Sequence, residues 1–297
     1  MHRSSFSRFP HRLRMLCRFL PVLLAGAASW LTGCTDDVLP PYHPELVVEG
    51  WIEEGGFPIV IVTQTIPLNG EYQDKSSLAD HIIQWATVSI SNGQDTVVLT
   101  GKVDKGYFPP FIYTTSKMRG EGGKTYRLKV EYADYCATAV TSIPPRPAVE
   151  EFIVEPIADP DTLYRVRVLL NDPPEEKNYY QLFCRTGGRS RQFLAAWLGS
   201  VDDAILDGPA WLDISRGHKL GITDQYTPYF YRGDTVAVKV SQITEDAYRF
   251  WNSYTKIVAE GNNLMWSSFK TLPSNITGGK GYWSGMGSVT DYFVISR

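Results

Sequence analysis

Short runs of β-branched and aromatic residues, separated by turn residues, recur along most of the chain. The 297 residues include 25 Gly and 19 Pro. Turn pairs such as Gly55-Gly56, Asn92-Gly93 and Gly122-Gly123 leave segments that are short for helices but long enough for strands. The spacing of these turns therefore predicts an all-β chain.

The first half of the chain has the strand density of an immunoglobulin-like β-sandwich. Residues 46–52 and 57–63 flank the Gly55-Gly56 turn and predict a hairpin. Further strands are predicted at 87–91, 96–100, 107–114 and 126–132. Six or seven strands in about 100 residues are typical of such a sandwich. The Cys…Trp…Cys pattern of true immunoglobulin domains is absent, so we expect the architecture alone over residues 46–143.

A proline-rich segment, residues 144–148, interrupts the strand pattern. Proline cannot donate a hydrogen bond to a sheet, so this segment is predicted to be a linker. Residues 149–297 are then expected to form a second β-rich domain, either a sandwich or barrel-like. Its predicted strands are 164–170, 178–185, 234–240 and 281–295, and its glycine-rich stretch 278–287 is interpreted as a flexible connection between strands.

One amphipathic helix is predicted within the second domain, near residues 245–260. Thr244 is a good N-cap, and Glu245 and Asp246 lie in the first turn, where the helix dipole favours acids. Apolar residues recur every three or four positions, which indicates one apolar face. They are Ala247, Phe250, Trp251, Tyr254, Ile257 and Val258. The helix is expected to cover an end or a face of the β-sheet.

The N-terminus has the pattern of a lipoprotein signal peptide. Five arginines precede a 13-residue apolar run, residues 19–31, and Gly33-Cys34 follows it. A transmembrane helix needs about 20 apolar residues, so this run is too short to span a bilayer. Residues 1–33 are predicted to be removed, leaving Cys34 lipidated at the start of a tether, residues 34–45. An ordinary cleaved signal with an incidental Cys34 is the alternative.

Charge limits the partners of the mature chain. Beyond residue 33 there are 24 basic and 32 acidic residues, with no basic run, which argues against nucleic acid as a ligand. Asp36 and Asp37 follow the lipid site and are interpreted as a possible signal for export to the cell surface, or else as part of a polar tether. The membrane is then expected as a partner through the acyl chains of Cys34.

The sequence contains no recognisable catalytic or metal-binding pattern. His43, His81 and His218 are the histidines beyond the signal, and none of them has the spacing of a zinc site. Asp202-Asp203, with Asp207, could hold calcium or form a solvated turn. We therefore expect no enzyme activity, no cofactor and no bound metal.

Two cysteines and one aromatic cluster complete the candidates. Cys136 and Cys184 are interpreted as buried free thiols or as a disulfide pair. Large rigid aromatics suit contacts with a glycan or peptide ligand, or with a protein partner, and otherwise belong to the core. The contact residues predicted on this basis are Tyr226, Tyr229, Phe230 and Tyr231.

The order of several segments resembles the Bacteroidota outer-membrane lipoproteins grouped as domain of unknown function 4249. Five segments carry the resemblance: Cys34 with the acidic residues after it; residues 46–52; residues 172–174 with 178–180; residues 233–236, which lead to 241–250; and residues 272–276 with 278–283. The resemblance implies no assigned activity and no catalytic residues. It does imply proximity to TonB-dependent outer-membrane transporters.

These observations lead to one expected function and two alternatives. We expect a surface-exposed, lipid-anchored outer-membrane protein that acts by binding, as an accessory or capture partner of a TonB-dependent transporter. The first alternative is a structural or adhesin-like envelope lipoprotein. The second is a surface hydrolase of glycan or peptide.

Overall fold

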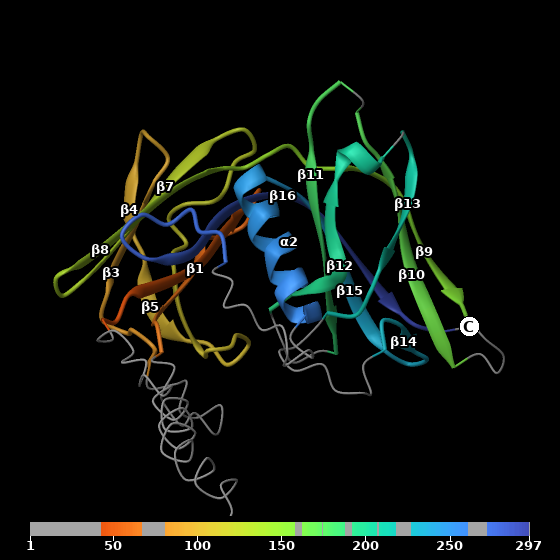
Figure 1. Ribbon diagram of the computed structural model, residues 1–297, viewed down its shortest axis with the longest axis horizontal. Coiled ribbons are helices and arrows are strands. Elements are labelled where there is room, and N and C mark those ends of the chain that lie inside the picture. Colours follow the sequence, from red (N-terminus) through yellow and green to blue (C-terminus); the bar gives the residue numbers. More distant parts are fainter. Residues whose placement is uncertain are drawn as a thin grey trace, which may run out of the picture. The chain divides into compact units, whose positions relative to one another are not determined.

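The structure is a computed structural model of the chain, shown as a ribbon in Figure 1. It describes residues 43–66, 81–157, 162–173, 175–187, 192–206, 208–217, 227–260 and 272–296, without the side chains of 258–260. Residues 44–297 form one compact unit.

The main element is an eight-stranded sheet, called here the long sheet. Its strands follow the order β12-β11-β15-β16-β1-β2-β6-β5. In chain order they are β1 (Leu46–Glu53), β2 (Ile59–Gln64), β5 (Thr100–Val103), β6 (Phe111–Thr114), β11 (Tyr179–Thr186), β12 (Leu194–Asp202), β15 (Thr235–Ile243) and β16 (Lys280–Val294).

Two four-stranded sheets complete the β structure. One has the order β4-β3-β7-β8, with β3 (Thr87–Ser91), β4 (Thr96–Val98), β7 (Thr125–Tyr132) and β8 (Tyr135–Ser142). In the other, β10 (Leu163–Asn171) pairs with β9 (Ala148–Pro156), β13 (Ala210–Ile214) and β14 (Phe230–Tyr231). A 3-10 turn, η2 (Asp203–Ile205), follows β12.

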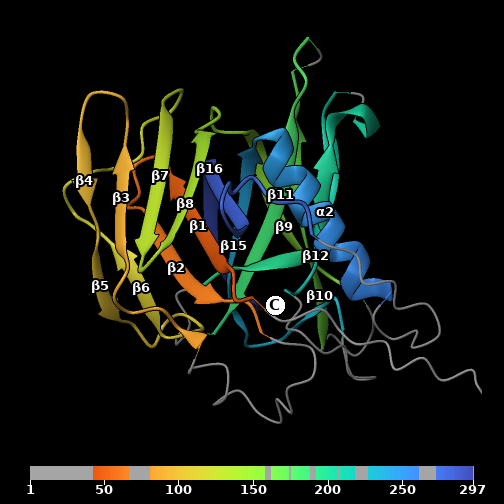
Figure 2. The ribbon, with the colours of Figure 1, turned by 60° about the vertical axis from the view of Figure 1, so that its left-hand side comes forward.

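The two halves of the chain meet at β16, in the middle of the long sheet. The first half of β16 pairs in parallel with β1, where Trp283 lies opposite Gly50. Its second half pairs antiparallel with β15, where Val289 lies opposite Val240. Figure 2 shows β1, β16 and β15 side by side. The predicted domains 46–143 and 149–297 therefore contribute strands to one sheet. Of the predicted linker 144–148, residues 144–147 lie between β8 and β9, and Ala148 is the first residue of β9.

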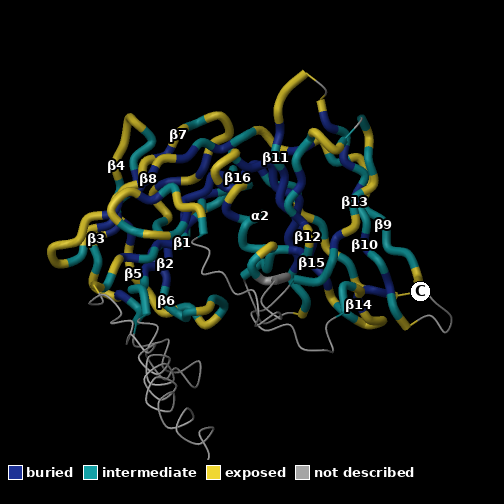
Figure 3. The backbone as a smooth tube through the Cα atoms, in the orientation of Figure 1, coloured by how far each residue is buried: buried dark blue, intermediate teal, exposed yellow. Residues whose placement is uncertain are grey.

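Each end of the long sheet packs against one of the smaller sheets and encloses a core. The first core includes Val48, Ile90, Tyr126 and Trp283, and the second includes Val168, Tyr180, Phe230 and Val238. The buried residues follow the strands of both halves in Figure 3. This arrangement confirms the predicted all-β fold, and the second half has the sandwich form of the two alternatives.

The predicted strand 281–295 is confirmed as β16, which begins at Lys280 and runs without a break to Val294, so the interpretation of the glycine-rich stretch 278–287 as a flexible connection is wrong. Its glycines allow other backbone segments to approach closely. A Cβ at Gly281, where φ is +111°, would lie 1.9 Å from the carbonyl oxygen of Val48. A Cβ at Gly285 would lie 2.1 Å from the oxygen of Ser142. Tight packing around a central strand therefore requires these residues.

The predicted helix is confirmed as α2 (Glu245–Glu260). The Thr244 carbonyl accepts a hydrogen bond from the Tyr248 N–H at 2.9 Å, which starts the helix. Ala247 and Phe250 are buried, and α2 packs on Phe183, Ile243 and Met286 of the long sheet. Within the described ranges, no helix has the length and apolar character needed to cross a bilayer.

Candidate functional site

The residues predicted to anchor the protein lie outside the described residues. Gly33 and Cys34 at the lipidation site and Asp36 and Asp37 in the tether all precede residue 43. Their roles stay predictions.

The predicted aromatic contact cluster is only partly at the surface. Tyr226 lies outside the described residues. Phe230 is fully buried in the second core, so its assignment as a contact residue is wrong. Adjacent side chains of β14 point to opposite faces, which leaves Tyr231 exposed. Tyr229 is also exposed, so two tyrosines of the set remain on the surface.

Arg216 and Asp234 fix the position of Tyr231. The Arg216 guanidinium lies 5.3 Å from the centre of the Tyr231 ring and 3.2 Å from an Asp234 carboxylate oxygen. The same Asp234 oxygen accepts a hydrogen bond from the Tyr231 N–H at 2.9 Å. Arg216, Tyr231 and Asp234 therefore contact one another beside the turn that follows β14, and we interpret these contacts as structural.

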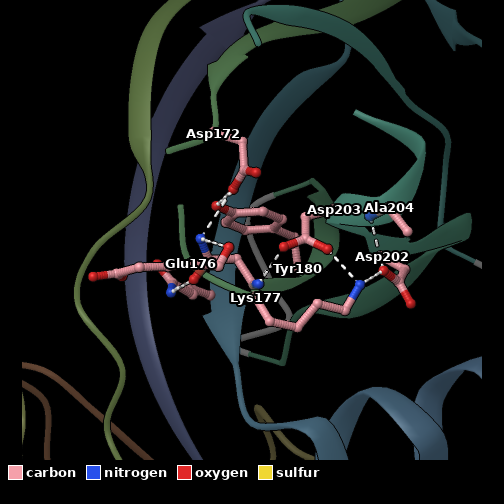
Figure 4. Close-up of polar contacts among 9 residues, drawn as sticks. Asp172, Glu176, Lys177, Tyr180, Asp202, Asp203 and Ala204 are labelled. Atoms are coloured by element: carbon pink, nitrogen blue, oxygen red, sulfur yellow. Dashed lines mark hydrogen bonds and ion pairs between the residues drawn. The ribbon is translucent and has the colours of Figure 1, made fainter. Parts of the chain in front are cut away.

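The acidic turn 202–203 holds a lysine ammonium. Figure 4 shows the Lys177 side chain extended between the carboxylates of Asp202 and Asp203, with which it forms hydrogen bonds and ion pairs. The Lys177 hydrogen bond lowers the pKa of Asp202, and the two carboxylates raise the pKa of Lys177. Asp202 also accepts from the Ala204 N–H at 2.9 Å and so caps η2.

The inner half of the same cluster joins three strand ends. The Tyr180 hydroxyl donates to Asp172, which also accepts from the Asn178 amide at 3.2 Å. Gln242 at the end of β15 donates to the Asn178 side-chain oxygen at 2.6 Å. Burial and the nearby Asp172 raise the pKa of Tyr180 well above its usual value. Because these buried polar groups satisfy one another, we interpret the cluster as structural.

Metal ligands do not gather anywhere in the part of the chain that the structure describes: it contains no group of three or more His, Cys, Asp or Glu placed to hold an ion. The two cysteines are free thiols rather than a disulfide. Cys136 is exposed, contrary to the expectation of burial, because it lies on the outer side of β8. Cys184 is buried, which raises its pKa to about 12.

Two acidic side chains of β1 are covered on the helix side of the long sheet. Glu49 accepts a hydrogen bond from the Tyr282 hydroxyl at 3.2 Å, and the Phe250 ring of α2 packs against Tyr282, with centroids 4.5 Å apart. Burial raises the pKa of Glu49 to about 7, although the Tyr282 hydrogen bond opposes the shift. Glu53, four residues further along β1, pairs with Lys239 instead.

The Lys239–Glu53 pair crosses the sheet from β15 to β1. The Lys239 Nζ lies 2.5 Å from a Glu53 carboxylate oxygen. It also lies 4.4 Å from the centre of the Phe193 ring and 5.1 Å from that of Phe183. The Lys239 side chain is 6% exposed. This ion pair is built into the packing where the two halves of the chain meet, so we regard it as structural.

The best candidate for a binding site is a groove of about 320 Å³ in the first sandwich, called here the Trp85 groove. It is lined by Gln84, Trp85, Ala86, Leu99, Gly101, Phe111 and Tyr113. Trp85 lies just before β3, and Leu99 lies where the chain crosses from β4 in one sheet to β5 in the other. The groove therefore lies beside β4 and β5, the edge strands of the two sheets, between segments that pass from one sheet to the other.

Trp85 is 87% exposed, the highest exposure among the large apolar residues of the described chain. The segment that carries it is nevertheless fixed. The Tyr113 hydroxyl donates to the Ile83 carbonyl and accepts from the Ala86 N–H, both at 2.9 Å. Burial raises the pKa of Tyr113. The hydroxyl thus ties down both sides of Trp85 and leaves its ring in solvent.

The floor of the groove is aromatic. The Phe111 and Tyr113 rings meet edge to face, with centroids 5.4 Å apart. Gly101 lets both rings lie against the β5 backbone, because a Cβ there would be 2.8 Å from Phe111 and 3.2 Å from Tyr113. Sequence reasoning did not single out this site. The available signal was Trp85 itself, a tryptophan outside the predicted strands.

Comparison with known proteins places the chain in a family. The family model for a domain of unknown function, DUF4249, matches residues 35–291. None of the curated proteins matches the chain. The matched residues include nearly all of the predicted mature chain, in agreement with the resemblance found in the sequence. This chain therefore belongs to the family of domain of unknown function 4249.

Proposed function

We propose that the protein is a lipid-anchored envelope protein that acts by binding, and that the Trp85 groove is a contact site. The observation that carries the proposal is the 87% exposed Trp85 on a segment held by Tyr113. A large apolar ring in water has no benefit for folding, whereas a rigid aromatic loses little conformational entropy on binding. An exposed, preorganised aromatic is therefore a favourable contact for a ligand or partner.

The anchoring part of the proposal comes from the sequence around Cys34. Acyl chains on that thiol would hold the acidic β structure at a membrane, and several chains are needed for stable anchoring. Family resemblance supports an outer-membrane location that faces the exterior, in a member of the Bacteroidota. It also supports a TonB-dependent transporter as the partner, with the protein as its accessory or as a capture protein for its substrate.

Mass spectrometry of the mature N-terminus tests the anchor. We expect residues 1–33 to be absent and Cys34 to carry acyl chains, and we expect Cys34→Ser to shift the protein from the membrane fraction to the soluble fraction. An unmodified Cys34, or an intact N-terminal segment, would contradict the anchor.

Affinity purification from detergent-solubilised outer membranes tests the binding role. The tagged protein should recover a TonB-dependent transporter, with a lower yield for Trp85→Ala. Tyr292→Ala is the matched control, because Tyr292 is a 64% exposed aromatic on β16, remote in sequence from the groove. Repeated recovery of no transporter by the unsubstituted protein would count against the partnership. If Trp85→Ala recovers as much transporter as Tyr292→Ala does, the groove takes no part in the partnership.

A further inference from the structure

We propose that the Trp85 groove binds a neutral sugar unit of a glycan. This inference deepens the proposed function, since it rests on the groove being a binding site and adds the class of ligand. Three observations favour a sugar: the composition of the groove lining, the exposed Trp85 ring on a fixed backbone segment, and the position of the groove relative to the open edge of β5.

The groove lining carries no formal charge. Its residues are aromatic, aliphatic or glycine, except for the Gln84 amide. A charged ligand would find no opposite charge to replace its hydration, so the lining favours an uncharged ligand. A primary amide both donates and accepts hydrogen bonds. Sugar hydroxyl groups also do both, and the exposed Gln84 amide can therefore pair with them.

The Trp85 ring offers a flat apolar surface to the ligand. The face of an aromatic ring carries negative electrostatic potential and its edge carries positive potential. The C–H bonds on one side of a pyranose ring are weakly positive and lie nearly in a plane, so they can stack on this face. Tyr113 fixes the segment on both sides of Trp85, which lowers the conformational entropy lost on stacking.

The size of the groove agrees with a small part of a longer ligand. Its volume of about 320 Å³ lies at the lower end of the range of about 300–1,000 Å³ found for ligand pockets. The Trp85 ring stands in solvent at its border. The groove therefore suits one or two sugar units of a chain that continues beyond it.

An extended peptide would use a different feature of the same region. β5 pairs with β6 alone among the described strands, so a peptide strand could add to its other edge through backbone hydrogen bonds. Such a strand would lie in the plane of the sheet. The groove instead lies over the face of β5 and β6 that carries Gly101, Phe111 and Tyr113. The groove geometry thus favours a ring stacked on aromatics over an added strand.

Affinity gel electrophoresis of the full-length protein tests the inference. The gels contain starch, xylan, mannan, mixed-linkage β-glucan or galactan as neutral probes, or polygalacturonate as an acidic one. We expect at least one neutral polysaccharide to retard the protein. Trp85→Ala should weaken that binding at least tenfold, and Tyr292→Ala should leave it unchanged. Circular dichroism would verify that both variants are folded, as expected for substitutions of exposed side chains.

The outcomes separate the inference from the proposed function. Retardation that depends on Trp85 and occurs with a neutral probe supports the inference. Retardation by polygalacturonate alone, retardation that Trp85→Ala does not change, or no retardation at all overturns it. If no neutral probe retards the protein while transporter recovery still depends on Trp85, the groove contacts protein, so the inference fails and the proposed function stands. If neither polysaccharide binding nor transporter recovery depends on Trp85, the inference fails and so does the part of the proposed function that makes the groove a contact site.

Discussion

Replacing Glu49 by glutamine should stabilise the protein at neutral and alkaline pH. The covered position of this side chain raises its pKa from 4.5 to about 7. Each pKa unit corresponds to about 1.36 kcal/mol, so the ionised carboxylate destabilises the folded state by up to about 3 kcal/mol. Glutamine keeps the size of the side chain and an acceptor oxygen for the Tyr282 hydroxyl, and it never ionises.

The sign of the pH dependence follows from the two pKa values. Below pH 4.5 the carboxyl group is protonated in both states, so its ionisation carries no penalty. Between pH 4.5 and about 7 the unfolded chain releases the proton while the folded protein retains it, and the free energy of unfolding falls as pH rises. Above pH 7 the penalty is complete. The stability advantage of Glu49→Gln should therefore grow across this window and then stay constant.

Urea unfolding between pH 4 and 8.5, followed by tryptophan fluorescence, measures this difference. Glu45→Gln is the matched control, because Glu45 lies just before the same strand with its side chain 52% exposed. Subtracting the parent curve at each pH removes the contributions of other titrating groups that the substitution does not affect. A difference between Glu49→Gln and the parent that does not change with pH would refute the reasoning, and so would the same rise in the Glu45→Gln control.

Three further predictions concern the strand junctions and the thiols. Lys239→Met should lower the free energy of unfolding by about 1–3 kcal/mol, because Glu53 loses its partner, and adding Glu53→Leu should recover part of the loss in the same urea assay. Gly281→Ala should reduce the yield of folded protein, since its Cβ would collide with the Val48 oxygen. The control Gly93→Ala has φ +90° but open space around it, so it should lower the free energy of unfolding by only about 1 kcal/mol. Iodoacetamide at pH 8 should label Cys136 but not Cys184 in the folded protein, and it should label both cysteines in urea. Peptide mass spectrometry measures the labelling, and equal labelling of the two cysteines without urea would contradict the burial of Cys184.

Local patterns of the sequence predicted many of the elements correctly. The β-branched and aromatic residues before the Gly55-Gly56 turn identified β1, and the alternation of apolar and polar residues identified β10. The combination of an N-cap with an apolar stripe identified α2. These signals depend on neighbours within a few residues. The predicted strand 96–100 was less accurate, because the chain leaves one sheet at Val98 and enters another at Thr100.

Features that depend on distant residues could not be predicted in this way. The pairing of β16 with β1 joins segments more than 200 residues apart, and glycines in β16 serve backbone segments that approach from elsewhere in the fold. The same limit applies to the candidate site. Trp85 and Phe230 are both aromatic, yet one is exposed and the other is fully buried, and only the surrounding strands decide which.

The position of β16 has a consequence for how the chain acquires its structure. Trp283 is part of the first core, so that core stays incomplete until nearly the whole polypeptide has been made. Contacts between such remote segments slow folding, because the long intervening chain must first be ordered. A fragment truncated after the first sandwich would expose an apolar surface and an unpaired β1 edge, and we expect it to aggregate. An export system that transports unfolded chains would therefore act on this polypeptide before its first core forms.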